Sequence, residues 1–216
     1  DGIMRECEAS LKRLGTDYID LYQIHWADPT TPVHESMEAV VRLIEQGKVR
    51  YAGVCNYDVA LMQEAARTID LVSDQVPYSM VRRDIENELV PYLMKNNQSV
   101  LAYSPLQRGL LAGKIKPGHN FSVGDTRADL PYYSEKNIEL TNRFLARIKP
   151  LADEKNATLS QLVIRWTIEQ PGITIALVGA RNAAQSVENA KAADIRLSTA
   201  ELSFMQSELD QLKLEL

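Results

Sequence analysis

The sequence predicts a parallel α/β protein, and more specifically a barrel in which strands alternate with helices. Short runs of β-branched and aromatic residues alternate along the 216 residues with segments whose apolar residues recur at helical spacing. Strands separated by helices pair in parallel through right-handed crossovers. The chain contains no Gly-x-Gly sequence, whereas the glycine fingerprint of a doubly wound dinucleotide-binding sheet requires one. The barrel is therefore the favoured architecture.

The predicted strands are short apolar runs that end in polar or small residues. They cover Tyr18–Trp26, Val49–Asn56, Leu71–Val76, Ser99–Leu106 and Ile173–Val178. Such runs are typical of strands that have helices on one face and a barrel interior on the other. In the first strand, alternation places His25 on the same side as Leu21 and Gln23.

Apolar stripes and end signals predict the helices between these strands. The stripes begin with Ile3, Cys7, Leu11 and Leu14, then Met37, Val40, Val41 and Ile44, then Leu61, Met62, Ala65 and Ile69, then Leu89, Val90, Leu93 and Met94. The first two helices are predicted to stop at Gly15 and Gly47. Helix-capping pairs are predicted at Thr158 with Gln161, Asn182 with Gln185, and Ser198 with Glu201.

The segment between the fourth and fifth strands breaks the regular alternation. Gln107–Asn137 is rich in glycine and proline and is predicted to be a long loop. Loops of that length usually serve as lids or binding loops. A helix is expected from about Ile138, interrupted or kinked near Pro150, since proline has no amide hydrogen to donate.

The number of strands predicts that the barrel is incomplete. A complete barrel has eight strands and roughly 250 residues, whereas this sequence supplies five strands. We therefore expect residues 1–216 to form the C-terminal portion of a single barrel domain, with about the last five strand-helix units and the N-terminal units absent. The start at Asp1, with Met4 inside a helical pattern, suggests the same.

Composition excludes several classes of function. A net charge of −5 and a pI near 5.3 predict no basic face for nucleic acid or anionic lipid. No apolar run is long enough for a membrane-spanning helix. Cys7 and Cys55 have no metal-ligand spacing, which favours a reducing, cytoplasmic compartment without a disulfide. His34 and His119 form no ligand spacing with His25, so no metal site is predicted.

Polar residues gather where the predicted strands end. These ends carry His25, Cys55 with Asn56, Gln75, Tyr103 with Ser104, and Gly179 to Arg181. In a barrel, the carboxyl ends of the strands face one common mouth, where functional residues lie. The sequence therefore predicts a single site built from all five strand ends.

Four motifs at these ends resemble the aldo-keto reductase family. LGTDYIDLYQIHW resembles the signature around the family's active-site histidine, and GVCNY resembles its GVSNF motif. AYSPLQRGLLAGK resembles its strand-seven loop, and VGARNAAQSVENA its adenosine-phosphate site. The resemblance runs from about Met4 to the last helix. It implies a (β/α)8 TIM barrel and NADPH-dependent reduction of a small aldehyde or ketone.

The resemblance assigns the reacting end of the site. His25 matches the histidine that orients and polarises the substrate carbonyl. Asn56 and Gln75 match residues that hydrogen-bond the nicotinamide carboxamide. Cys55 stands where the family usually has serine, a stronger hydrogen-bonding group. Tyr103 matches the aromatic residue that stacks on the nicotinamide ring.

The resemblance also assigns the phosphate end. The pyrophosphate would lie along Ser104, Pro105, Leu106, Gln107, Arg108, Gly109 and Leu110. Gly179 and Ala180 lead to Arg181, which matches the ligand of the adenosine 2′-phosphate and favours NADPH over NADH. Gln185, Glu188 and Asn189 match positions around this phosphate and the adenine, although many relatives have arginine in place of Gln185.

The family's acid-base tyrosine, with its lysine and aspartate, belongs to the first three strand-helix units, and no residue here matches them. Tyr22, Tyr57 and Tyr78 lie elsewhere in the pattern. The isolated chain is therefore expected to be inactive. Two alternatives stay open: a regulatory or binding protein on the same fold, like the potassium-channel β-subunits, and an unrelated phosphate-binding barrel such as an isomerase. The oligomeric state is not encoded in any motif.

Overall fold

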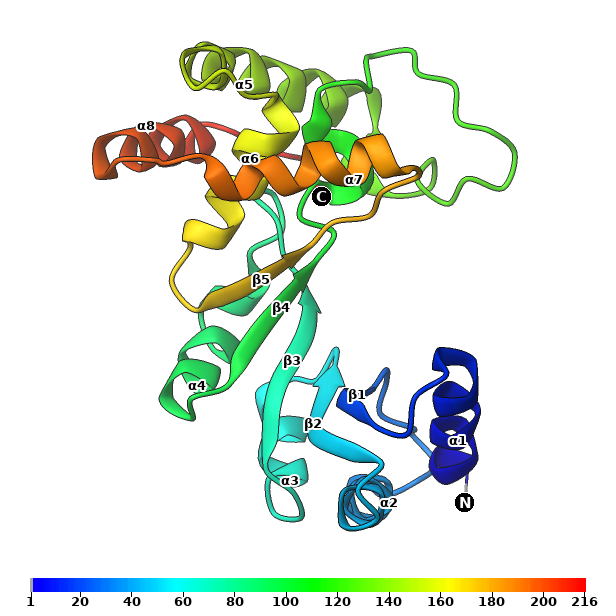
Figure 1. The fold of residues 1–216 in the computed structure, drawn as a ribbon. Helices are drawn as coiled ribbons and strands as arrows, with labels where there is room; N and C mark the ends of the chain where they lie inside the picture. The colour runs from blue at the N-terminus through cyan, green and yellow to red at the C-terminus, as the bar shows by residue number, and fades with distance from the viewer. Residues whose placement is uncertain (1) are drawn as a thin grey trace. The chain divides into compact units, whose positions relative to one another are not determined.

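A computed structural model of the chain describes residues 2–216, and its strands form one sheet (Figure 1). The strands are β1 (Ile19–Ile24), β2 (Val49–Cys55), β3 (Leu71–Pro77), β4 (Ser99–Tyr103) and β5 (Ile173–Leu177). Their order in the sheet is β1-β2-β3-β4-β5, so each strand neighbours the one before it in the chain. β1 pairs with β2 and β2 pairs with β3 in parallel. This order lacks, within residues 2–216, the reversal that defines a doubly wound sheet, and it agrees with barrel-type winding.

The chain divides into two compact units. The first contains the residues up to Pro77, Asp84–Leu101 and Gly172–Ile175. The second contains Tyr78–Arg83, Ala102–Pro171 and Ala176–Leu216. β4 and β5 begin in the first unit and end in the second.

In the first unit, helices pack against β1, β2 and β3. They are α1 (Gly2–Leu14), α2 (Val33–Glu45), α3 (Val59–Ala65), the short 3₁₀ turn η1 (Asp84–Glu86) and α4 (Leu89–Lys95). Cys7, Leu11, Leu43 and Val49 form one buried cluster. The predicted stripe of α1 is wrong at its end, because Leu14 is 66% exposed. Leu14 is the last helical residue, and Gly15 turns the chain away there with a φ of 67°.

Gly53 lies at a point of close packing between neighbouring strands in this unit. A β-carbon on Gly53 would lie 2.6 Å from Ser73 Oγ, 3.2 Å from Gln23 Cγ and 3.2 Å from Leu21 Cδ1. The side chains of Leu21 and Gln23 therefore both face Gly53, in agreement with the predicted alternation along β1. Ser73 is buried and cannot move into solvent, so this position requires glycine.

The second unit is mainly helical. It contains η2 (Gln107–Ala112), η3 (Pro131–Tyr133), α5 (Glu135–Glu154), α6 (Leu159–Glu169), α7 (Ala183–Ala190), η4 (Lys191–Asp194) and α8 (Thr199–Asp210). Trp166 of α6 is buried and stacks on Tyr78 with ring centroids 6.2 Å apart. The Arg83 guanidinium lies 5.4 Å from the centre of the Trp166 ring. This aromatic pair anchors the core of the unit.

The predicted helix caps are confirmed. Thr158 with Gln161, and Ser198 with Glu201, form reciprocal capping boxes. Asn182 caps α7 by accepting a hydrogen bond from the Gln185 amide.

Two expectations in the second unit are wrong. The long loop is shorter than predicted, because η2 and η3 lie within it and α5, capped by Ser134, begins at Glu135, three residues before Ile138. Pro150 does not interrupt α5, which continues to Glu154. Proline removes one intrahelical hydrogen bond, and burial of the apolar side chains on either side of Pro150, those of Ile148 and Leu151, offsets this loss.

Candidate functional site

In the first unit, Asn56 joins the ends of β1, β2 and β3. Its side-chain Nδ2 donates to the carbonyl of His25 at 3.2 Å, and its amide donates to the carbonyl of Gln75 at 3.0 Å. Cys55 lies opposite Gln75 in the strand register. Asn56 has a φ of 60°, a left-handed conformation that asparagine tolerates better than most residues. The structure therefore brings together the four predicted residues His25, Cys55, Asn56 and Gln75.

Cys55 is held as a neutral thiol. Its sulfur accepts a hydrogen bond from Gln23 Nε2 at 3.1 Å. Burial raises the pKa of the Cys55 thiol, the Gln23 hydrogen bond lowers it, and the nearby Asp74 raises it further. A thiol with a raised pKa is a poor nucleophile, which supports a positioning role for Cys55. Gln23 was not predicted as a site residue, although its alternation with His25 in β1 was a usable signal.

His25 is exposed at the end of β1, next to an exposed tryptophan. Its ring lies 5.8 Å from that of Trp26, at an interplanar angle of 41°. Trp26 is 60% exposed, an unusual state for a large aromatic side chain. This end of the strand therefore offers an imidazole and an apolar surface to a ligand.

Asp74 is a second residue of this region, after Gln23, that was not predicted as a site residue. It precedes Gln75 in β3 and is completely buried. Burial raises the pKa of the Asp74 carboxyl to about 7, while the nearby backbone amides of Tyr57, Asn56 and Gln75 lower it. Neither oxygen of the Asp74 carboxyl accepts a hydrogen bond of normal geometry from these amides. A charge in an apolar strand was the available signal in the sequence.

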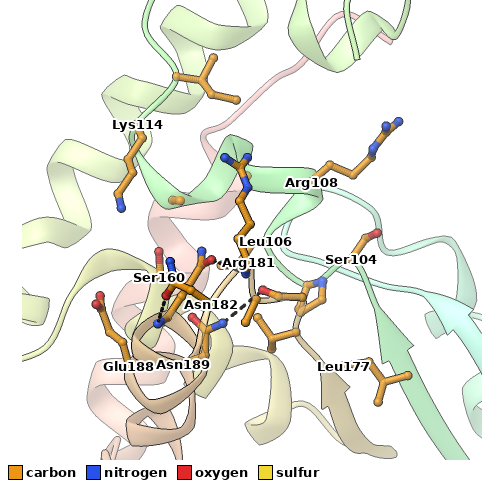
Figure 2. Close-up of a pocket in the computed structure, with 18 of the residues that line it drawn as sticks. Ser104, Leu106, Arg108, Lys114, Ser160, Leu177, Arg181, Asn182, Glu188 and Asn189 are labelled. Atoms are coloured by element: carbon orange, nitrogen blue, oxygen red, sulfur yellow. Dashed lines mark hydrogen bonds between the residues drawn. The ribbon is translucent and has the colours of Figure 1, made fainter. Parts of the chain in front are cut away.

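In the second unit, the segments that follow β4 and β5 line one pocket of about 950 Å³ (Figure 2). Its walls include these predicted residues: Ser104, Pro105, Leu106, Arg108, Gly109, Gly179, Ala180, Arg181, Gln185, Glu188 and Asn189. Tyr103 is not among the lining residues, and its carbonyl accepts a hydrogen bond from the Tyr78 amide at 3.1 Å.

The turn after β5 is shaped by side chains of α7. The Gln185 Oε1 atom accepts a hydrogen bond from the Arg181 amide at 2.8 Å, and Asn182 Oδ1 accepts one from the Gln185 amide at 2.8 Å. Asn189 Nδ2 donates to the carbonyl of Gly179 at 3.3 Å. The turn is therefore fixed while the exposed Arg181 guanidinium extends into the pocket (Figure 2).

Lys114 and Ser160 line the same pocket and were missed by the sequence analysis. Lys114 follows Gly113, which turns the chain with a φ of 71°. Lys114 and Arg181 both line the pocket, and so does Glu188 of α7 (Figure 2). Two cations and a single carboxylate in this part of the pocket favour an anionic ligand. The GK pair at the end of AYSPLQRGLLAGK was the signal for Lys114.

Arg108 lines the pocket but directs its guanidinium away from Arg181 (Figure 2). Its Nη2 donates to Thr126 Oγ1 at 2.8 Å, and its carbonyl accepts from Arg127 Nη1 at 3.1 Å. Arg127 is paired with Asp125 at 2.6 Å. The Arg127 hydrogen bonds hold the pKa of Asp125 at about 2. These contacts fasten part of the predicted lid to the turn that carries Arg108.

Residues 2–216 hold no group of three or more histidine, cysteine or acidic side chains placed to bind a metal. Within the same residues, every helix is too short or too polar to cross a membrane.

The parallel sheet and the segments that follow its strands are matched by known proteins. The family model described as "Aldo/keto reductase family" matches residues 1–209. The chain belongs to the aldo/keto reductase family. Members of this family are oxidoreductases that use nicotinamide cofactors and act on small carbonyl compounds.

Several curated relatives are similar over most of the chain. Aldo-keto reductase YhdN of Bacillus subtilis is 37% identical over 184 residues, covering 85% of this chain and 56% of the relative. The NADH-specific methylglyoxal reductase of Escherichia coli is 33% identical over 216 residues, covering 99% of this chain and 66% of the relative. The chain thus spans about three fifths of the length of such relatives.

Solved structures show the same likeness. The glycerol dehydrogenase AKR11B4 of Gluconobacter oxydans is 33% identical with a TM-score of 0.92, covering 97% of this chain and 64% of that one. An aldo/keto reductase of Klebsiella pneumoniae, in complex with NADP and acetate, is 33% identical with a TM-score of 0.72, covering 95% of this chain and 64% of that one. The predicted α/β class is confirmed at the level of the parallel sheet, whereas the predicted restriction to the last five units of a barrel stays a prediction.

Proposed function

We propose that this chain carries the cofactor-binding part of an NADPH-dependent reductase of small aldehydes or ketones. The observation that supports this proposal most directly is the pocket in the second unit. Two separate segments, Ser104–Gly109 and Gly179–Asn189, contribute to its wall, and its volume of about 950 Å³ is sufficient for a dinucleotide half.

The charges of the pocket suit the phosphates of NADPH. Arg181 can form a bidentate contact with a 2′-phosphate, and Lys114 adds a second positive charge to the pocket wall. Gly109 lets the backbone approach the pyrophosphate, since it has a φ of 99° and no side chain. The relatives include one that is named as NADH-specific and one solved with NADP, so preference for NADPH rests on Arg181 in this chain.

The strand ends of the first unit suit the nicotinamide. A carboxamide needs both donors and acceptors, which the side chains of Asn56 and Gln75 supply. The Asn56 bond to the His25 carbonyl fixes the end of β1. We assign Tyr103 to stacking on the nicotinamide ring, and Cys55 to support of the Asn56 turn.

The bound cofactor would supply a hydride for addition to the carbonyl carbon. The imidazole of His25 would donate a hydrogen bond to the carbonyl oxygen and stabilise the negative charge that grows there. Trp26, exposed beside it, would exclude water from the substrate. These two residues orient the substrate, and neither replaces a tyrosine proton donor.

We further propose that residues 1–216 alone do not complete the reaction. No residue among them matches the family's acid-base tyrosine. Addition of a small aldehyde and NADPH to the purified chain should give no oxidation of NADPH above background, while NADPH should still quench the fluorescence of Trp26. Quenching by sugar phosphates instead of NADPH would indicate a phosphate-binding barrel of another type. A turnover rate above background would contradict the proposed inactivity.

A further inference from the structure

Asp74 lies under the turn that carries Asn56. In the register of β2 and β3, Asp74 pairs with Val54 and the next pair is Cys55 with Gln75. Successive side chains of a strand point to opposite faces, so Asp74 and Gln75 face opposite sides of the sheet. Asp74 is therefore placed behind the proposed nicotinamide contacts and does not contact the ligand directly.

Within residues 2–216, the groups that act on the Asp74 carboxyl include no positive charge. The groups that act on its carboxyl are the backbone amides of Tyr57, Asn56 and Gln75. The titratable groups around it are the buried phenol of Tyr57 and the thiol of Cys55, with Glu64 of α3 beyond Tyr57. Each of these three groups is neutral or negative. A fully buried carboxyl with no cation beside it is costly to maintain and calls for a reason.

We propose that Asp74 is a positioning residue whose protonation state sets the geometry of the Asn56 turn and, through it, the affinity for the nicotinamide end of the cofactor. The proposal rests on the proposed function, because it gives a role to the same site. In the ionised form, the carboxylate attracts the amides of Asn56 and Tyr57 and tightens the turn. In the protonated form, this attraction is lost.

The Asn56 turn is suited to respond to such a change. Asn56 is in the left-handed region, with a φ of 60°, where the backbone has a conformational cost unless neighbouring contacts hold it. The contacts that hold it include those to the His25 carbonyl and to the Gln75 carbonyl. Because Asn56 is bonded to both of these carbonyls, a shift of its amide toward Asp74 would also move His25 and Gln75.

The response should fall in the neutral pH range, because the pKa of Asp74 is raised to about 7. A site linked to one proton changes its affinity by at most about tenfold for each pH unit. We therefore expect the cofactor Kd of the chain to fall about fivefold between pH 6 and pH 8. NADH is the suitable probe, since it lacks the 2′-phosphate of NADPH, which itself titrates near this range.

The test compares the chain with Asp74→Asn, which keeps the shape of the side chain and removes its titration. Asp70→Asn, an exposed position just before β3, is the matched control. Amide NMR signals of Asn56 and Tyr57 are followed from pH 5 to pH 9, and the NADH Kd is measured at pH 6 and pH 8. We expect the amides and the Kd to titrate together in the native chain and in Asp70→Asn, and to be independent of pH in Asp74→Asn.

The two measurements separate the possible failures. If the two amides do not titrate, or titrate equally in Asp74→Asn, the inference about Asp74 is overturned whatever the cofactor does. If the amides titrate with Asp74 while the Kd stays constant, the turn responds but does not control binding, and the inference is again overturned. If the amides titrate with Asp74 and neither NADH nor NADPH binds at any pH, the proposed function fails instead.

Discussion

The strand ends of the first unit and the pocket of the second unit are built in different ways. The strand ends of the first unit are fixed by hydrogen bonds to backbone carbonyls around Asn56. The pocket of the second unit is an open, charged wall, from which Arg181 extends into solvent-accessible space. Short, buried contacts impose geometry, while exposed charges attract an anion with little geometric demand. The first region thus controls how the reacting ring would lie, and the second how strongly the phosphates would be held.

The largest expected effect concerns the buried charge of the first region. The Asp74 pKa is about 7 in the folded chain, against an ordinary value of 3.8. Between pH 3.8 and about pH 7, the Asp74 carboxyl therefore keeps its proton in the folded chain and loses it in the unfolded chain. Native stability should therefore fall as pH rises from about 4 to 7, by a ceiling of about 4 kcal/mol. Asp74→Asn should abolish this fall in urea unfolding at pH 5 and pH 8. Parallel curves for the two proteins would contradict the assignment.

The next largest effect is a difference in packing between the strands of the first unit and the pocket wall of the second. Gly53→Val places a branched side chain against buried Ser73 and should destabilise the chain by about 2–3 kcal/mol. Gly179→Ala meets no atom within 4 Å and should change the free energy of unfolding by less than about 0.5 kcal/mol. Urea denaturation of both variants tests this contrast. Equal losses would show that the pocket wall is as tightly packed as the strands.

Two substitutions of Asn56 distinguish what its side chain contributes to cofactor binding from what its backbone conformation contributes to stability. Asn56→Ala removes the bond to the His25 carbonyl and puts a β-carbon in the left-handed region, at a cost of about 1–2 kcal/mol. Asn56→Gly removes the same bond but tolerates the φ of 60°. Both should weaken cofactor binding about tenfold, while thermal unfolding should show that the alanine variant is the less stable of the two. If the glycine variant binds the cofactor as tightly as the native chain, the Asn56 side chain does not contact the cofactor.

The smallest effect is expected at the ion pair of the second region. The Arg127 hydrogen bonds lower the pKa of Asp125 to about 2, so the pair should persist at all pH values above its ordinary pKa and be lost as pH falls toward 2. Asp125→Asn should change the melting temperature little, because the two partly buried residues belong to one short turn and asparagine keeps an oxygen that can accept from Arg127. It should speed limited proteolysis within residues 117–131. Unchanged cleavage would show that other contacts hold this segment.

Sequence reasoning succeeded where the pattern is local. The capping boxes at Thr158 and Ser198 lie within one helical turn, so their residue types alone determine the contact. Strands are also predicted from local pattern, because their side chains alternate every two residues. The structure brings His25 and Asn56 together at the strand ends, as expected.

The remaining features depend on contacts between distant segments. The raised pKa of Asp74 comes from burial under a turn that precedes it in the chain, which no spacing rule reports. Arg108 lines the pocket as predicted residues of its segment do, but the bond of its guanidinium to Thr126, far along the loop, could not be predicted from the sequence. Pro150 was expected to interrupt a helix that burial of its neighbours keeps intact.

Binding of two cofactors to three proteins tests the central claim most directly. Kd values for NADPH and NADH would be measured by Trp26 fluorescence for the native chain, Gln75→Ala and Arg181→Ala. Arg181→Ala should raise the Kd of NADPH at least about tenfold and leave that of NADH unchanged, because the lost contact is to the 2′-phosphate. Gln75→Ala should raise both by the same factor, because the nicotinamide is common to the two. Equal responses of NADPH and NADH to Arg181→Ala would contradict the assignment of the pocket.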